Sequence, residues 1–427
     1  AAAIEVADLK FIEFSSDEGL SSNAVLDIAE DDKGYIWLAT MNGLNRYSGY
    51  EIKQYHPSDT NDNALPGGFI QELFIDSQGR LWVGTDSGLA LYQPETDDFL
   101  VFNQENSVMK SDSVTAISES IGGDILFSDN KYLYRLNRES LEVTVLTKVF
   151  EQNTIVKAIF DEPNRTWIGS NTSGAKIYDK TVDKVYSLNG VNPFGVVIDD
   201  IAFHDIKVIN GNYWIATSDG VKVVNASGDI IFELDEEILG SNGKLNVLSI
   251  ESVGSDTWLA TDLGLFVVKN TSNNDFSFTD VRSIHLKNEL FNITGLKEKI
   301  FIKILKDDKD GVWLGSLQGA YKFHPSYAQI RFQPIYSSDD KSELATIWGL
   351  DKTTNGEIFF VSQRDGVGAI NTETSTIESL AIPSLPQNGL SYWYLVIDNE
   401  NNFWVATSSG LFAFEKNGNT LKVKSHL

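Results

Sequence analysis

The sequence predicts an all-β protein built from repeated four-stranded units. Three observations carry this prediction. A short tryptophan motif returns at regular intervals, polar turn residues separate short apolar runs, and no long stretch shows the helical period. The chain has 427 residues, and its apolar share of 42% is ample for a hydrophobic core.

Tryptophan marks the repeat. Seven of the nine tryptophans are followed by an aliphatic residue, then Gly or Ala, then Thr or Ser. The interval is about 46 residues, and two intervals are about twice as long, so each should hold a degenerate copy. The nine predicted repeats are centred on Trp37, Trp82, Leu126, Trp167, Trp214, Trp258, Trp313, Phe359 and Trp404.

The second repeat illustrates the unit. Its apolar runs at 69–75, 81–85, 89–92 and 99–102 read as four strands, and Asp76–Gly79 forms the first turn. Four strands at a period near 45 are typical of the antiparallel blades of a β-propeller. The small residue after each tryptophan would let neighbouring blades approach, while the tryptophan fills the wider space, so we expect all seven tryptophans in the core.

Nine repeats leave the ring count open. We favour residues 1–427 as one propeller domain with a single large ring, because two stray blades could not bury both faces. The alternative is a seven-bladed ring followed by two blades of a second. Residues 10–14 and 420–424 both read as a fourth strand, and in a single ring one of them would be surplus.

Composition excludes several chemistries. The absence of Cys excludes disulfides, cysteine–zinc sites, iron–sulfur clusters and thiol nucleophiles. A net charge of -26 argues against nucleic acid and anionic membranes as partners. No run of 18 apolar residues is present, no signal peptide is visible, and the five His show no metal-binding spacing. We therefore expect no metal and no cofactor.

Three segments of the first repeat resemble a known family. Gly19–Val25, Asp31–Trp37 and Asn42–Tyr47 are similar to the two-component regulator propeller repeat, whose motif runs as an apolar strand, Asp-x-x-Gly, Trp-Ile-Gly-Thr, Gly-Leu and Arg-Tyr. The resemblance covers nearly the whole chain. The repeats at Leu126 and Phe359 depart from it by lacking the tryptophan.

The resemblance implies a role in signalling. Such propellers are typically the periplasmic sensor part of a bacterial membrane receptor, whose output is a histidine kinase, often a hybrid one, or a diguanylate cyclase. Several are associated with carbohydrates. The expected partners are thus a small-molecule or oligosaccharide ligand and the rest of a membrane receptor, with a homodimer as a further expectation. The chain carries no kinase motif, so it is a sensor fragment or a free-standing binding propeller.

The loop mouth of the propeller is the predicted ligand site. The turns between second and third strands emerge there and are rich in Asp and Asn, which suits hydroxyl recognition, although these residue types also simply make turns. The candidate residues on these turns are Asn42, Asp86, Asp219, Asp262 and Gln318.

Aromatic residues next to the mouth form a second group of candidates. Trp348, Tyr392 and Trp393 lie where a first strand begins, and their rings could stack on a sugar, with core packing as the alternative. Arg364 stands in a degenerate repeat whose loop is one residue longer than its counterparts.

Two other function classes remain. A propeller glycoside-processing enzyme such as a sialidase would need three arginines around a carboxylate, but the chain has only eight and most belong to the repeat scaffold, so we predict no catalysis. Glycosidase carboxylates among 60 acidic residues keep that alternative open. A protein-interaction scaffold is the third class, and exposed apolar residues on the outer fourth strands would favour it.

Overall fold

The computed structural model describes residues 11–152, 154–190, 193–195, 197–198, 201–234, 245–254, 256–269, 300–323, 347–354, 356–362, 366–371, 376–383 and 390–427. These residues form antiparallel sheets joined by turns, with one short 3-10 turn, η2 (Ser16–Glu18). The contacts divide the chain into unit 1, residues 1–329, and unit 2, residues 330–427. The predicted all-β fold is confirmed, and no described helix could cross a membrane.

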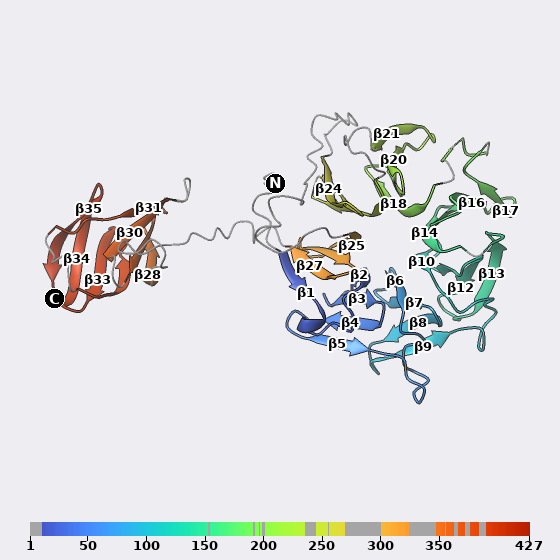
Figure 1. Ribbon diagram of the computed structural model, residues 1–427, viewed down its shortest axis with the longest axis horizontal. Helices are drawn as coiled ribbons and strands as arrows, with labels where there is room; N and C mark the ends of the chain where they lie inside the picture. Colours follow the sequence, from blue (N-terminus) through green and yellow to red (C-terminus); the bar gives the residue numbers. More distant parts are fainter. Residues whose placement is uncertain are drawn as a thin grey trace. The chain divides into compact units, whose positions relative to one another are not determined.

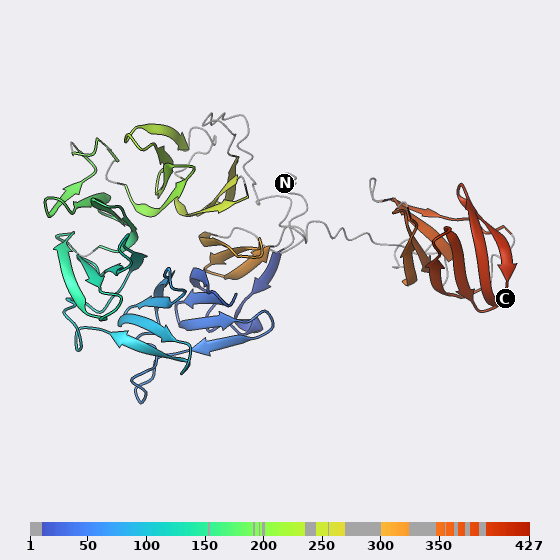
Figure 2. The ribbon, with the colours of Figure 1, turned by 180° about the vertical axis from the view of Figure 1, so that it is seen from behind.

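Unit 1 contains seven sheets that stand around a common axis, each with its first strand innermost (Figures 1 and 2). Sheets one to four are β2 (Val25–Glu30), β3 (Ile36–Thr40), β4 (Gly43–Tyr47) and β5 (Ile52–Tyr55); β6 (Ile70–Ile75), β7 (Leu81–Thr85), β8 (Gly88–Gln93) and β9 (Asp98–Phe102); β10 (Ala116–Glu119), β11 (Ile125–Ser128), β12 (Tyr132–Leu136) and β13 (Val143–Lys148); and β14 (Val156–Asp161), β15 (Arg165–Ser170), β16 (Ala175–Asp179) and β17 (Lys184–Ser187).

Sheets five to seven complete the ring. They are β18 (Phe203–Ile209), β19 (Asn212–Thr217), β20 (Gly220–Val224) and β21 (Ile230–Leu234); β22 (Val247–Val253), β23 (Asp256–Thr261) and β24 (Gly264–Lys269); and β25 (Phe301–Lys306), β26 (Val312–Ser316) and β27 (Gly319–Phe323) joined by β1 (Phe11–Phe14). The strands predicted around Leu126 and Phe359 are both present, as β11 and as β29 of unit 2.

Unit 2 is a pair of four-stranded sheets. Sheet eight is β28 (Ile347–Lys352), β29 (Ile358–Ser362), β30 (Gly366–Asn371) and β31 (Thr376–Ser379), and sheet nine is β32 (Tyr392–Ile397), β33 (Asn402–Thr407), β34 (Gly410–Asn417) and β35 (Thr420–His426). The two sheets share one apolar core, to which Phe359, Leu395 and Phe403 belong.

The ring closes after seven sheets, which corrects the expectation of a single ring of nine. β1 pairs antiparallel with β27, from Phe14 opposite Ala320 to Phe11 opposite Phe323, so the N-terminal strand completes the seventh sheet (Figure 1). The seventh sheet then packs directly on the first, with Trp313 of sheet seven and Leu38 of sheet one in one core. Neither candidate fourth strand is surplus, because β1 serves sheet seven and β35 serves sheet nine.

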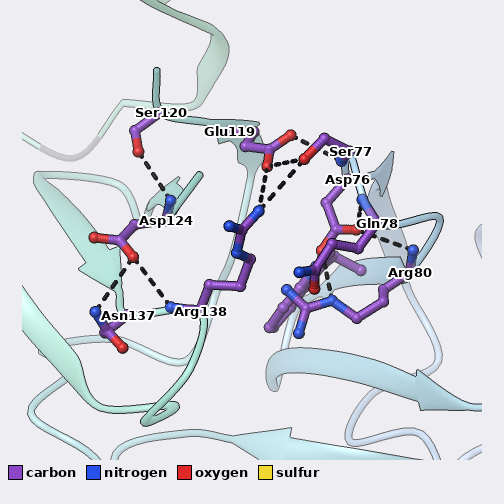
Figure 3. Close-up of polar contacts among 10 residues, drawn as sticks. Asp76, Ser77, Gln78, Arg80, Glu119, Ser120, Asp124, Asn137 and Arg138 are labelled. Carbon is purple, nitrogen blue, oxygen red and sulfur yellow. Dashed lines mark hydrogen bonds and ion pairs between the residues drawn. The ribbon is translucent and has the colours of Figure 1, made fainter. Parts of the chain in front are cut away.

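Neighbouring sheets are also joined by carboxylates on the face of the first turns. The backbone N–H and the hydroxyl of Ser77 donate to Glu119 of the next sheet at 2.8 and 2.6 Å, and Arg138 contacts the same carboxylate at 3.4 Å (Figure 3). The closing contact repeats this bond, because the N–H of Asp308 in sheet seven donates to Glu30 of sheet one at 2.6 Å. The seventh-to-first contact is therefore an ordinary contact between blades.

The first-turn aspartate explains the spacing of the motif. One oxygen of Asp31 accepts the N–H groups of Lys33 and Tyr35, and the other accepts the indole N–H of Trp37 at 2.8 Å. Four other sheets hold their tryptophan in the same way, through a carboxylate that also belongs to the first turn. The pairs are Trp82 with Asp76, Trp167 with Glu162, Trp313 with Asp307, and Trp404 with Asp398.

The expected core position is confirmed for six tryptophans. Trp37, Trp82, Trp167, Trp214, Trp258 and Trp313 are buried. Trp404 is only half-buried, because it lies outside the apolar core that sheets eight and nine share.

The small residue after the tryptophan permits close approach between blades, as predicted. A Cβ on Gly84 would lie 2.8 Å from the carbonyl oxygen of Val114 in the next sheet, and one on Gly315 would lie 3.0 Å from that of Val25. A Cβ on Gly169 would overlap the ring of Phe203.

Gly169→Ala should therefore lower the stability of unit 1 by about 1–3 kcal/mol, because the overlap with Phe203 forces neighbouring sheets apart. Thermal unfolding of the full chain measures this. Gly190→Ala is the matched control, since its added Cβ would meet no atom within 4 Å. Equal melting temperatures for the two variants would contradict the close-packing explanation.

Candidate ligand-binding site

The turns between second and third strands lie on the same face of unit 1 as the loops that lead into the first strands. The N–H of Gly43 donates to the carbonyl of Gly68 at 2.7 Å, and the N–H of Gly220 donates to that of Leu245 at 2.7 Å. Each of these bonds joins a second turn to the loop that enters the next sheet. At these two places the loops of the predicted mouth are hydrogen-bonded to one another.

Hydroxyl groups fix the shape of these turns. Thr40 donates to the carbonyl of Gly43 at 2.8 Å and accepts the N–H of Asn42 at 3.1 Å. The last residue of the tryptophan motif is therefore Thr or Ser because the turn needs a buried hydroxyl. The same donor bond is made by Thr85, Ser170, Thr217, Thr261, Ser316 and Thr407.

The rim candidates differ in what their side chains do. Asn42, Asp86 and Gln318 are exposed, and their side chains make no hydrogen bond with the described part of the chain. Asp262 instead accepts the N–H of Asn246 at 3.1 Å, and burial raises its pKa. Asp219 is half-buried, and its N–H donates to Thr217. The side chain of Asp262 therefore helps to shape its turn, whereas those of Asn42, Asp86 and Gln318 do not.

The aromatic candidates lie in unit 2. Trp348 on β28 and Trp393 on β32 are each 51% exposed, so neither ring is packed in the core. Tyr392 is buried in the core shared by sheets eight and nine. Arg364 lies outside the described residues. Of the described candidates, five belong to unit 1, and Trp348, Tyr392 and Trp393 belong to unit 2.

Sequence reasoning missed a polar cluster on the innermost strands of unit 1. Near its start, the first strand carries an irregularity in register in most sheets, and a polar residue follows it in five of them. A β-bulge of this kind re-aims a side chain. The five residues are Asp27, Glu72, Asp205, Ser249 and Lys303.

Two of these aspartates join neighbouring sheets. Asp27 accepts the N–H of Leu73 in the second sheet at 2.7 Å and the ammonium of Lys303 in the seventh at 2.8 Å. Asp205 accepts the N–H of Ile250 in the sixth sheet at 2.9 Å. Their carboxylates are thus occupied by the fold itself.

Glu72 occupies the equivalent position in sheet two but makes no hydrogen bond with the described residues. Burial, together with the charges of Asp27 and Asp205, raises its pKa well above the ordinary value, although Lys303 and Lys157 act in the opposite direction. Burial alone would lower the pKa of Lys303, but the surrounding carboxylates outweigh it and raise that pKa.

His204 adds a neutral group next to this cluster. Burial and the charge of Lys157 lower its pKa to about 4, so it is uncharged at neutral pH. Its Nε2 atom is buried without a hydrogen-bond partner among the described residues. The cluster therefore combines a free carboxylate, two lysines and a neutral imidazole, and no group of described residues is arranged to hold a metal ion.

A sequence signal for the cluster did exist. Asp27 and Lys303 stand ten residues before the tryptophan of their repeat and Asp205 stands nine before, each near the start of a first strand that is mostly apolar. A charge at a core position is unusual unless it is paired or functional.

Comparisons with known proteins agree with the repeat. The family model described as "Two component regulator propeller" matches residues 19–42 and 64–87. These two segments are thus similar to the two-component regulator propeller repeat. Histidine kinase P4 of Formosa agariphila is 33% identical over 55 residues, which is 13% of this chain and 4% of that protein.

Solved structures share the fold of the chain. An extracellular domain assigned to a hybrid two-component system of B. thetaiotaomicron matches with a TM-score of 0.56 and 19% identity, covering 98% of this chain and 60% of that one. A second B. thetaiotaomicron domain, assigned to a one-component system, gives 0.56 and 15%, covering 98% and 61%. The chain thus spans about three fifths of these domains.

An enzyme is also similar in fold. Virginiamycin B lyase from Staphylococcus aureus, in a structure with quinupristin, matches with a TM-score of 0.55 and 14% identity, covering 74% of this chain and 98% of the lyase. At this identity the likeness concerns the fold alone.

Glu72→Gln should raise the melting temperature at pH 8 by about 1–3 °C and change it little at pH 4. The raised pKa means that the folded state holds the proton more tightly than the unfolded chain, so this contribution to stability is lost as pH rises through the folded pKa. Glutamine cannot ionise and escapes that loss. Thermal unfolding across this pH range measures the effect.

Glu105→Gln is the control, because Glu105 is exposed in the loop after β9. If the gain in melting temperature from Glu72→Gln became smaller with rising pH, the folded state would not raise the pKa of Glu72.

Proposed function

We propose that the chain is the periplasmic sensor domain of a bacterial signal-transduction receptor, which passes its signal to a cytoplasmic output domain outside this chain. The propeller repeats and the likeness to extracellular domains of two-component systems support this role. The likeness to a histidine kinase, although short, supports a kinase output. Assembly as a homodimer within the receptor is part of the proposal, and the charge of -26 argues against nucleic acid.

The ligand is a small polar molecule, with carbohydrate as the first candidate, bound at the rim of unit 1. One observation carries this: Asn42, Asp86 and Gln318 have free side chains on turns that buried hydroxyls hold in place. Because the backbone of these turns is already held in place, binding of sugar hydroxyls by their side chains costs little backbone conformational entropy.

Unit 2 offers a second carbohydrate contact. Trp348 and Trp393 are half-exposed at equivalent positions of neighbouring inner strands, β28 and β32. Exposed indole faces suit stacking against the C–H face of a sugar ring. Each unit would contribute its own contact, and no site shared between them is required.

A binding role is preferred to catalysis. The enzyme alternative stays open as a lyase-like propeller, because nearly the whole chain of virginiamycin B lyase matches this fold. The side chains of Asn42, Asp86 and Gln318 are not paired with a general base among the described residues. Product formation during any ligand screen would decide for the enzyme.

A thermal-shift screen of the full chain against oligosaccharides, amino acids and small carboxylates tests the proposal. We expect an oligosaccharide to raise the melting temperature. Asn42→Ala or Gln318→Ala should weaken its binding about three- to tenfold, the contribution of one hydrogen bond. Trp348→Ala with Trp393→Ala separates the unit 2 contact from the rim.

Lys33→Ala is the control, since Lys33 is exposed on a first turn, at the other end of β3 from the rim. An absence of shifts across the library would reject small-molecule sensing and favour a protein partner. Equal losses for the rim and control variants would reject the rim as the site.

A further inference from the structure

We propose that the axial channel of unit 1 binds a small organic ammonium group, with Glu72 as the carboxylate that receives it. This inference rests on the proposed function as a ligand sensor and names the ligand chemistry. Solvent reaches the space around the axis. Two lysines on innermost strands show this, since Lys157 is exposed and the side chain of Lys303 is 29% exposed.

The position of Glu72 links the channel to the rim. Glu72 lies opposite Gly84, whereas Ile70, two residues earlier, lies opposite Thr85 at the start of the Asp86 turn. Two residues of strand correspond to about 7 Å. A ligand that reaches the rim of sheet two can therefore place one functional group at Glu72.

The hydrogen bonds of the cluster leave Glu72 as the free acceptor. Asp27 is occupied by Leu73 and Lys303, and the carboxylate of Asp205 by the N–H groups of Ile206 and Ile250. Glu72 alone of the three carboxylates has no such donor in the described structure. A carboxylate without a protein donor is open to a ligand that supplies one, and a cationic donor would form the stronger, charge-assisted hydrogen bond.

The net charge of the cluster around Glu72 favours a cationic ligand group. Three carboxylates act on one another here, those of Asp27, Glu72 and Asp205, against the two ammonium groups of Lys157 and Lys303. The cluster therefore carries one negative charge in excess when Glu72 is ionised. A cationic ligand group would balance it and form a charge-assisted hydrogen bond.

The geometry favours an organic ammonium over a metal ion. No three acidic or histidine side chains of the described residues converge as metal ligands. The single free carboxylate of Glu72 instead suits a group with several N–H donors. An amino sugar and a free amino acid both carry such a group, and an amino sugar would also present hydroxyls to the rim.

Calorimetric titration of the full chain at pH 7 tests this, with glucosamine and glycine as probes and with N-acetylglucosamine and N-acetylglycine as matched controls that lack the ammonium charge. We expect one of the two amines to bind and its acetylated form to bind at least about tenfold more weakly. Binding of glucosamine alone assigns an amino sugar, and binding of glycine alone assigns an amino acid.

Glu72→Gln should weaken binding of that amine at least about tenfold, while Glu105→Gln should leave it unchanged. Glu72→Asp serves if the glutamine variant does not fold, and should give a smaller loss. Amines that do not bind, acetylated probes that bind equally well, or amine binding unchanged by substitution of Glu72 would each overturn the inference.

The oligosaccharide screen separates this outcome from the proposed function. Oligosaccharide binding that depends on Asn42 but not on Glu72, without amine binding, would retain the sensor and reject the channel site. Amine binding that depends on Glu72 but not on Asn42 would place recognition in the channel alone.

Discussion

The structure of unit 1 depends on one packing constraint: both faces of every blade must be covered by a neighbour. A single four-stranded sheet cannot stand alone, so the ring is stable only when its last sheet meets its first. Trp313 of the last sheet and Leu38 of the first lie in one core, and Lys303 reaches Asp27 across the same boundary. The motif residues serve this constraint, since Gly or Ala after the tryptophan sets how near the next sheet can come.

The same constraint places polar chemistry in two layers near the axis. At the rim, buried hydroxyls close each turn and leave a few amide and carboxylate groups facing solvent. Just inside, bulged first strands turn Asp27 and Asp205 towards the N–H groups of the next sheet. Glu72 occupies that layer in sheet two without a bond of this kind.

The sequence was informative where a residue's role is local. The tryptophan spacing predicted the sheets, including those without tryptophan at Leu126 and Phe359, because turns and strands depend on nearby residues. Ring size could not be obtained in this way, since it depends on β1 pairing with β27 rather than on the number of repeats. The exposure of Trp348 and Trp393 was equally out of reach, because it depends on which faces of unit 2 find a neighbour. Glu72 was missed because a first strand was treated as a plain apolar run.

The pairing of β1 with β27 also has a consequence for biosynthesis. Phe14 leaves the ribosome early, but its partner Ala320 is made about 300 residues later. At 5–20 residues per second, β1 waits about 15–60 s for its sheet. During that time Phe14 and the side of sheet one that it covers remain open to other chains, so the growing protein is at its most vulnerable to misassembly just before the ring is complete.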